Sequence, residues 1–249
     1  MDAGPSSLVP PSPSGNHQPL PATSKFININ YENAATYAAQ IPANHVALTF
    51  DDGPTREYTL PILDKLRQYG MKATFFVIGG RVAQNCDILQ QIYREGHEIG
   101  NHTYDHLLLT QESSQVQWAQ LAKNQQQIHQ CLQQIGVNYY PRWFRAPYGD
   151  QNAQVLGHVK ALGMNSALWS LDTHDWNLET TAAMIANSVI QGGDRQLVLM
   201  HDGTEFNPAM QSNPQLNPTR QPTVEALDQI LADYRAKGIS SLTLSQAFP

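Results

Sequence analysis

The run Val46-Ala47-Leu48-Thr49-Phe50-Asp51-Asp52-Gly53-Pro54 sets the framework for interpreting the rest of the chain. A short apolar run bounded by turn residues is typical of a buried strand, and Gly53-Pro54 ends this one. Two adjacent carboxylates repel each other, so a fold tolerates them best where a cation or a proton neutralises one. The strand is therefore expected to deliver Asp51 and Asp52 to a site at its end.

Strands and helices alternate along the chain from residue 45 onward. The expected strands are 45–50, 73–78, 97–100, 142–145, 166–171, 196–200 and 241–244, and the expected helices are 58–69, 82–95, 113–135, 153–162, 180–190 and 223–237. This alternation is typical of βαβ units around a parallel sheet. We predict an α/β fold, a distorted (β/α) barrel with about seven strands, whose active site lies at the carboxyl ends of the strands.

The composition excludes several classes of partner. The chain has 249 residues, 41% of them hydrophobic and 14% charged, as in a soluble globular protein. Its formal charge is −6 and it has only 15 Lys and Arg residues, which argues against nucleic acid or an anionic membrane as partner. No run approaches the roughly 18 apolar residues of a membrane span.

The first 24 residues differ in composition from the rest of the chain. Residues 1–24 are rich in Pro and Ser and lack the apolar core of a signal peptide, so we expect a disordered linker there and a single domain over residues 25–249. We expect an export signal or anchor to have preceded this linker, which predicts a secreted, periplasmic or cell-envelope protein. The alternative is a cytosolic protein with a flexible start.

Two cysteines, Cys86 and Cys131, both fall in expected helices, and neither belongs to a CxxC pair. A thiolate metal site is therefore not expected. The two could form a disulfide in an oxidising compartment or remain buried thiols, because the sequence does not give their separation.

His102 and His106 follow the expected strand 97–100 and are four residues apart. On one helical turn both imidazoles would point the same way, which suits a chelate to a borderline metal. With Asp52 they would form a His-His-Asp set with positions open for water and substrate, as in a catalytic zinc site. Such a pair also occurs as surface or capping residues, but its position at a strand end favours the metal site.

If Asp52 binds a metal, Asp51 is free to act as general base on a water bound to that metal. The guanidinium of Arg145 could pair with Asp51 and fix its rotamer. The turn around Pro147 and Gly149 could aim the backbone N–H of Tyr148 at a developing oxyanion. The structural alternative is a turn in which the two aspartates only accept bonds from backbone N–H groups.

His201 follows the strand 196–200 and could protonate a leaving group, with Asp175 orienting it. Trp176 and Leu199 could wall a small apolar pocket. The alternatives are a core histidine and ordinary core packing. His174 is expected to support the site at most from outside it. The long Pro/Asn/Gln-rich loop 203–222 is expected to be functional, because such loops are uncommon in compact domains.

Together these stretches resemble the polysaccharide deacetylase family, carbohydrate esterase family four, also called the NodB homology domain. The resemblance runs from about residue 45 to the C-terminus and rests on the motifs Thr49–Pro54, His102–His106, Arg145–Gly149, Asp172–Trp176 and Leu199–His201. It implies a NodB-type barrel that removes acetyl groups from N-acetylated sugars of a chitin-type or peptidoglycan-type polysaccharide. No motif position departs from the family pattern.

The resemblance also implies roles for individual residues. The implied roles are Asp51 as base, His201 as acid, Asp52, His102 and His106 as ligands of a divalent metal, commonly zinc or cobalt, Arg145 positioning Asp51, Asp175 or else Asp172 supporting His201, the Tyr148 N–H stabilising the oxyanion, and Trp176 and Leu199 lining the acetyl methyl pocket. The expected partner is an acetylated polysaccharide or oligosaccharide, and the expected oligomeric state is a monomer. Alternative functions are an O-acetyl esterase on acetylxylan, a non-catalytic glycan-binding module and an amidohydrolase acting on a small cyclic amide.

Overall fold

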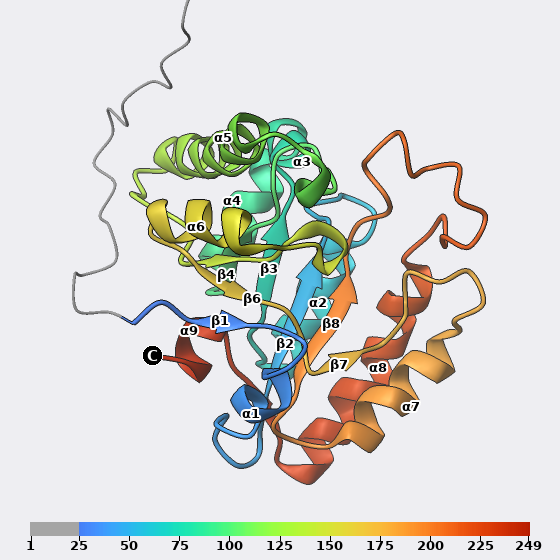
Figure 1. Ribbon diagram of the computed structural model, residues 1–249. Helices are drawn as coiled ribbons and strands as arrows, with labels where there is room; N and C mark the ends of the chain where they lie inside the picture. The colour runs from blue at the N-terminus through green and yellow to red at the C-terminus, as the bar shows by residue number, and fades with distance from the viewer. Residues whose placement is uncertain (1–24) are drawn as a thin grey trace, which may run out of the picture.

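The computed structural model describes residues 25–249 (Figure 1), and the linker predicted over residues 1–24 lies outside them. The strands are β1 (Asn28–Ile29), β2 (His45–Asp51), β3 (Thr74–Val77), β4 (Glu98–Asn101), β5 (Trp143–Phe144), β6 (Asn165–Ala167), β7 (Leu171–Asp172), β8 (Leu197–His201) and β9 (Ser240–Ser241). The α-helices are α1 (Ala34–Ala38), α2 (Thr59–Tyr69), α3 (Gly79–Gln84), α4 (Cys86–Arg94), α5 (Ser114–Gln133), α6 (Ala153–Ala161), α7 (Ala182–Gly192), α8 (Gln221–Lys237) and α9 (Leu244–Ala247). Short 3₁₀ turns occupy Leu109–Gln111 and Pro147–Gly149.

The strands form one parallel sheet in the order β1-β6-β5-β4-β3-β2-β8-β7, with β9 pairing the start of β2. The larger helices pack around the outside of this curved sheet (Figure 1). Within residues 25–249 no pairing joins the edge strands β1 and β7, so the barrel is open. The predicted distorted (β/α) barrel is confirmed, with nine strands in the described chain where about seven were expected.

Strand β2 shows how the sequence builds the barrel. Its outward side chains are Val46, Leu48 and Phe50, which join the core cluster shared with α2 and α8. Its inward side chains change character along the strand. Ala47 packs in the apolar interior, Thr49 accepts a hydrogen bond from Arg145, and Asp51 reaches the carboxyl end. Because side chains alternate along a strand, one strand supplies both the core and the site.

Both ends of the described chain lie at the amino ends of the strands, opposite Asp51. The N–H of Ile27 donates to Asn165 at the start of β6, and β9 pairs with the first residues of β2. Ile29 and Phe248 belong to one apolar cluster. Figure 1 shows the first described residues near the C-terminus, away from the tips of β2 and β8.

The expected strand 166–171 is wrong, because the chain forms two short strands in different parts of the sheet. β6 lies beside the edge strand β1, whereas β7 is the opposite edge strand. Arg145 explains the break: its Nε donates to the carbonyl of Ala167 at 2.9 Å and its Nη2 to that of Leu168 at 3.2 Å. Trp169 lies in the connection, which carries the chain between the two parts of the sheet.

Two other expected elements also need correction. The single helix expected over 82–95 is two helices, α3 and α4, which meet at Asn85 with backbone φ −133° and ψ 46°. The amide of Asn85 donates to the carbonyls of Pro54 and Arg81, which holds this break. The strand expected over 241–244 is shorter, because a capping box between Thr243 and Gln246 starts helix α9 there.

The longest helix, α5, is confirmed close to its expected bounds. Cys131 on α5 forms a disulfide with Cys86 at the start of α4, with Cα atoms 5.6 Å apart. Of the two alternatives for the cysteines, the structure therefore has the disulfide. Among the helices of residues 25–249, none is both long and apolar enough to cross a membrane.

Candidate active site

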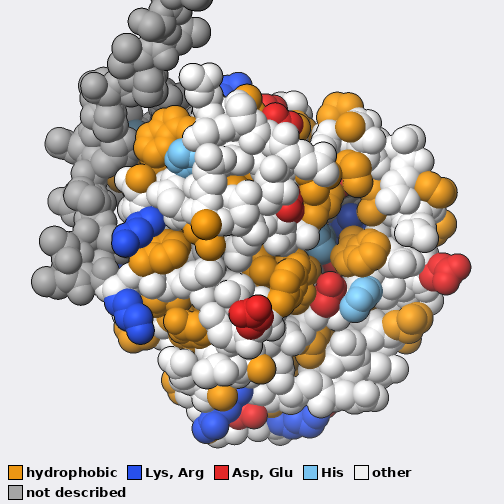
Figure 2. All heavy atoms as spheres, viewed as in Figure 1, with side chains coloured by type: hydrophobic (Ala, Val, Ile, Leu, Met, Phe, Trp, Pro, Cys, Tyr) orange, Lys and Arg blue, Asp and Glu red, His pale blue; other side chains and the backbone are white. Residues whose placement is uncertain are grey.

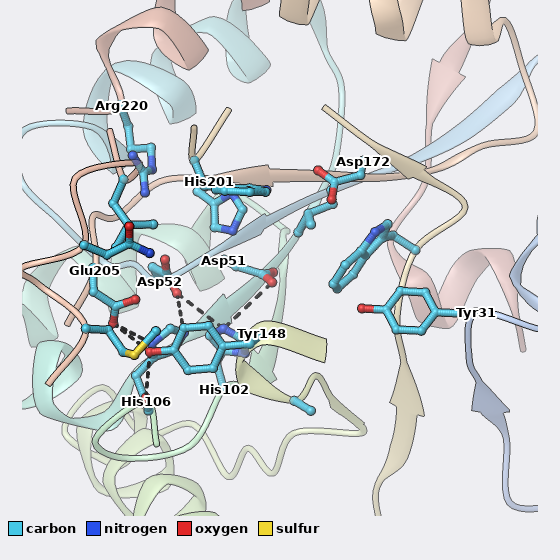
Figure 3. A pocket seen from close by; sticks show the side chains of 17 residues that line it. Tyr31, Asp51, Asp52, His102, His106, Tyr148, Asp172, His201, Glu205 and Arg220 are labelled. Atoms are coloured by element: carbon cyan, nitrogen blue, oxygen red, sulfur yellow. Dashed lines mark hydrogen bonds and ion pairs between the residues drawn. The ribbon is translucent and has the colours of Figure 1, made fainter. Parts of the chain in front are cut away.

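A pocket of about 350 Å³ opens at the carboxyl ends of the strands. Figure 2 shows this face hollowed, with histidine and acidic side chains in and beside the hollow and hydrophobic side chains around it. Figure 3 shows its labelled side chains converging from several elements. The lining includes Asp51, Asp52, His102, His106, Tyr148, Trp176, Leu199 and His201 among the residues predicted from the sequence. Arg145 and Asp175 lie behind this surface, each in contact with a lining residue.

Asp51 and Asp52 both reach the pocket because the backbone turns between them. Asp51 is the last residue of β2, and Asp52 adopts a left-handed conformation with φ 78°. Asp is one of the few residues other than glycine that visits this region. The turn is held by Asp202, whose N–H donates to the carbonyl of Asp51 and whose carboxylate accepts from the N–H of Gly53. Both aspartates are almost fully buried.

His102 and His106 lie on a loop after β4, so the single helical turn expected for them is wrong. His106 has φ 58°, which a helix does not allow. Both rings nevertheless converge on one oxygen. The Nε2 atoms of His102 and His106 lie 3.3 and 3.1 Å from Oδ1 of Asp52. The loop therefore brings the two rings together, as the four-residue spacing predicts, but without a helical turn.

The donor set of this cluster fits a cation. Nδ1 of His102 donates to the carbonyl of Arg145 at 2.8 Å, and Nδ1 of His106 donates to Glu205 at 2.9 Å. In the neutral form both rings then turn an Nε2 lone pair toward Asp52. The buried Oδ1 of Asp52 has no hydrogen-bond donor. Candidate metal-ligand atoms of Asp52, His102 and His106 all lie within 4.8 Å of one another.

The electrostatics of the cluster favour positive charge at this point. Burial raises the pKa of Asp52, but His106 and His102 outweigh it and hold that pKa well below its usual value. Burial lowers the pKa of His106, but Asp52 and Glu205 raise it to about 9. The same carboxylates that attract a proton to His106 would attract a metal ion.

Arg145 fixes the second aspartate. It is fully buried, and its Nη1 donates to Oδ1 of Asp51 at 2.7 Å and to Thr49 at 2.8 Å. With its bonds to two backbone carbonyls, the guanidinium is held on several sides. Asp51 is therefore held in one rotamer, with its other oxygen 3.8 Å from Nε2 of His102.

His201 ends β8 and is paired with Asp175 rather than Asp172. Its Nδ1 lies 2.6 Å from Oδ1 of Asp175, whose other oxygen accepts from the His201 N–H and from Thr223. Burial lowers the pKa of His201, but the charge and hydrogen bond of Asp175 raise it to about 9. The surroundings of His201 therefore favour its protonated form at neutral pH. His174 is exposed and does not line the pocket; its N–H donates to the carboxylate of Asp172, and its Nδ1 lies 3.1 Å from the carbonyl oxygen of the same residue.

Tyr148 follows β5 in a left-handed conformation with φ 58°, and its side chain is partly exposed at the pocket. Its ring packs on that of His106, with centroids 4.6 Å apart. Trp176 and Leu199 supply apolar lining. The structure thus brings together every residue predicted for the site.

Other lining residues were not predicted from the sequence. They are Tyr31, Trp169, Glu205, Met210, Asn213, Leu216 and Arg220. Five of these, Glu205, Met210, Asn213, Leu216 and Arg220, lie in the loop 203–222 that is predicted to be functional. The length of the loop therefore indicates the segment, but it does not indicate which of its residues line the pocket. Asp202 was also missed, and burial raises its pKa to about 7.

The fold and the site define an open (β/α) barrel in which Asp52, His102 and His106, a cluster that could hold a metal ion, lie beside an Asp–Arg pair and a His–Asp pair. Residues 38–167 match the family model described as polysaccharide deacetylase. The chain belongs to this polysaccharide deacetylase family.

Curated relatives agree with this assignment. The chain is 32% identical over 227 residues to the peptidoglycan-N-acetylglucosamine deacetylase PgdA of Listeria monocytogenes, a match that covers 89% of this chain but 43% of that protein. It is 31% identical to the chitooligosaccharide deacetylase of Azorhizobium caulinodans, covering 82% of this chain and 95% of that protein. The chain thus spans less than half the length of the Listeria relative.

Solved structures share the fold. The Bc1960 peptidoglycan N-acetylglucosamine deacetylase matches with a TM-score of 0.72 at 32% identity, over 84% of this chain and 90% of that chain. A protein described as a CE4 family pseudoenzyme from Bacillus anthracis matches with a TM-score of 0.69 at 26% identity, over 83% of this chain and 66% of that chain. Membership of the fold is therefore compatible with both active and inactive sites.

Proposed function

We propose that this chain is a metal-dependent hydrolase that removes acetyl groups from N-acetylated sugars of a polysaccharide. The observation that carries the proposal is the convergence of three groups on one pocket: a cation-binding cluster, a fixed carboxylate and a buried histidine that carries a proton. Amide hydrolysis needs all three, because water must lose a proton, the carbonyl oxygen must gain charge and the amine must be protonated as it leaves.

The proton path follows from the positions of two side chains. Asp51, oriented by Arg145, accepts the proton of the water that attacks the acetyl carbonyl carbon. His201, protonated beside Asp175, gives its proton to the sugar nitrogen as the carbon–nitrogen bond breaks. The products are acetate and a free amine. Asp51 and His201 then exchange protons with solvent before the next cycle.

Asp52, His102 and His106 would hold the metal, and we propose zinc because one carboxylate and two imidazoles suit it. When bound, a divalent ion supplies Lewis acidity, which lowers the pKa of water and polarises a carbonyl oxygen. The backbone N–H of Tyr148 is proposed to donate to that oxygen as it becomes negative, and losing one such donor typically costs about 3 kcal/mol. Trp176 and Leu199 are proposed to enclose the acetyl methyl group.

The substrate is proposed to be a peptidoglycan-type or chitin-type glycan. The names of the relatives support this class, since one is a peptidoglycan-N-acetylglucosamine deacetylase and another a chitooligosaccharide deacetylase. We further propose that the protein works outside the cytoplasm. The Cys86–Cys131 disulfide supports that location, because disulfides persist in oxidising compartments.

A non-catalytic role is the second candidate, since one structural relative is described as a pseudoenzyme. Release of acetate separates the two candidates. The protein is stripped of metal with a chelator and assayed on peptidoglycan, chitin oligomers and acetylated xylan, before and after zinc is restored. We expect no activity without metal and recovery with zinc on at least one N-acetylated glycan. Activity confined to acetylated xylan would instead indicate an O-acetyl esterase, and no release from any glycan would indicate a binding protein.

A further inference from the structure

Glu205 lies beside the cation-binding cluster, although no sequence motif marks it. It follows β8 at the start of the long loop, and its side chain is only 9% exposed. One oxygen, Oε1, accepts hydrogen bonds from Nδ1 of His106 at 2.9 Å, from the hydroxyl of Tyr148 at 3.0 Å and from the N–H of Asn207 at 2.7 Å. Figure 3 shows Glu205, His106 and Tyr148 in contact at one side of the pocket. One carboxylate thus touches two parts of the site.

The bond to His106 fixes a candidate metal ligand. In its neutral form, a histidine that donates from Nδ1 presents Nε2 as the acceptor, which is the form that binds a metal. Here Nε2 points to Oδ1 of Asp52 at 3.1 Å. His106 has no helix to hold its ring, because its backbone is left-handed. Outer partners of this kind orient the ligand and raise its basicity. The ring of His106 therefore depends on Glu205 for its orientation.

The hydrogen bond from the Tyr148 hydroxyl to Glu205 fixes Tyr148, which lines the pocket next to His106. Tyr148 is also left-handed, a conformation that is uncommon for a bulky residue and is kept only where its surroundings hold it. The hydroxyl bond to Glu205 and the ring contact with His106 supply such surroundings. The backbone N–H of Tyr148 belongs to the same residue, so its direction is coupled to the same contacts.

Hydrogen bonds from Arg81 hold the backbone next to Glu205 at the start of the loop. Arg81, on α3, donates from Nη1 to the carbonyl of Asp52 at 2.7 Å and from Nη2 to the carbonyl of Thr204 at 2.8 Å. Its guanidinium lies 5.3 Å from the ring centre of Phe206. The residues on both sides of Glu205 are therefore tied to the cluster that Glu205 contacts.

We propose that Glu205 is a positioning residue that aligns His106 and Tyr148 and thereby sets the affinity of the site for its metal. The inference rests on the proposed function, because it assumes that Asp52, His102 and His106 bind a divalent ion. It makes the long loop part of the metal centre and not only part of the substrate groove.

The test is zinc affinity, measured on metal-free protein by competition with a chelating dye. Glu205→Ala removes all the bonds to Oε1 and should weaken zinc binding by about tenfold or more. Glu205→Gln keeps an acceptor oxygen and should remain closer to wild type than to Glu205→Ala. Glu225→Ala is the matched control, since it removes the same charge from an exposed position on α8 and should leave zinc affinity unchanged. Circular dichroism establishes that each variant is folded.

The outcomes separate the inference from the proposed function. Wild-type affinity in folded Glu205→Ala would overturn the inference, and so would an equal loss in Glu205→Gln, because the effect would then come from charge and not from hydrogen bonding. If Glu205→Ala does not fold, Glu205→Asp replaces it: the shorter carboxylate should bind zinc more weakly, and unchanged affinity would overturn the inference. If the wild-type protein itself binds no zinc, the proposed metal centre fails first.

Discussion

The two adjacent aspartates differ in backbone, partners and charge environment. Asp51 continues the extended strand and is held by Arg145, whereas Asp52 turns into a left-handed conformation toward two histidines. The residues predicted for the site could be found from sequence motifs, because each lies in or just after the carboxyl-terminal part of a strand of a parallel barrel. Glu205 could not be found this way, since its partners are distant in sequence and its loop has no periodicity.

Replacing Asp51 with Asn should separate metal binding from turnover. We expect acetate release to fall by about a hundredfold or more, because the base is lost. Zinc affinity should stay near wild type, since Asp52, His102 and His106 remain. The change also leaves the buried guanidinium of Arg145 without its carboxylate, so thermal unfolding must be measured alongside. A folded variant that retained most of its activity would refute the assignment of Asp51 as base.

The His201–Asp175 pair predicts an alkaline limit to activity. A general acid must be protonated, so kcat/KM should fall as pH rises through about 9, the raised pKa of His201. In Asp175→Asn the raising charge is gone, and the midpoint should move down toward the ordinary value for histidine, about 6.5. Activity at pH 8 should then fall by about tenfold or more.

The full pH profile of kcat/KM is measured for the wild-type protein and for Asp175→Asn. Because the folded-state pKa of His201 is raised, its contribution to stability is full below pH 6.5 or so and disappears as pH rises through about 9. The resistance of the protein to denaturant should therefore decline over the same range. An identical alkaline midpoint in Asp175→Asn would remove His201 as the titrating acid.

At the scale of elements, periodicity located the long helices well and the short strands poorly. Helix α5 has an amphipathic pattern long enough to define it, and Gly70 ends α2 in the left-handed conformation expected of a helix stop. The region 166–171 predicts one strand because it is a short, mainly apolar run with no Gly or Pro to interrupt it. Its division depends on Arg145, whose bonds to backbone carbonyls no local pattern can indicate.

The junction between β8 and the following loop has no room for a side chain at Gly203. A Cβ there would lie 2.4 Å from the carbonyl oxygen of Asp52 and 1.9 Å from Nη1 of Arg81. Gly203→Ala should therefore destabilise the protein by about 1–3 kcal/mol, as overpacking does, and weaken zinc binding. Gly157, exposed on α6 with nothing within 4 Å, is the control.

Chemical denaturation gives the free energy of unfolding of Gly203→Ala and of Gly157→Ala, each compared with the wild-type protein. Gly157→Ala should stabilise the protein by about 0.5–1 kcal/mol, because alanine is the better helix former. Equal stabilities for the two variants would show that the contact at Gly203 relaxes without effect.

At the scale of the whole molecule, the disulfide links α4 to α5 on the outside of the barrel, and its cysteines lie 45 residues apart in sequence. Replacing both cysteines with serine should lower the free energy of unfolding by about 2–4 kcal/mol, because the unfolded chain gains freedom. Acetate release under native conditions should be unchanged, since neither cysteine lines the pocket. A loss of activity in the folded variant would show that the helix pair communicates with the site.

The barrel itself could be predicted from the sequence, but the gap between its edge strands could not. Alternation of strands and helices indicated a parallel barrel, because such units have few alternatives. It could not indicate that β1 and β7 do not pair with each other, since each of these edge strands is only two residues long. The point where β6 ends depends on the bonds of Arg145 to the carbonyls of Ala167 and Leu168, which join residues more than twenty positions apart in the chain.

Both ends of the described chain lie at the amino ends of the strands, whereas the pocket opens at the carboxyl ends. A resin or a cell surface attached at either end would therefore leave the pocket facing outward, toward bulk solvent. If the proposed function holds, a protein immobilised in this way would meet an insoluble glycan sheet or fibre with its pocket, and the support would not stand between them.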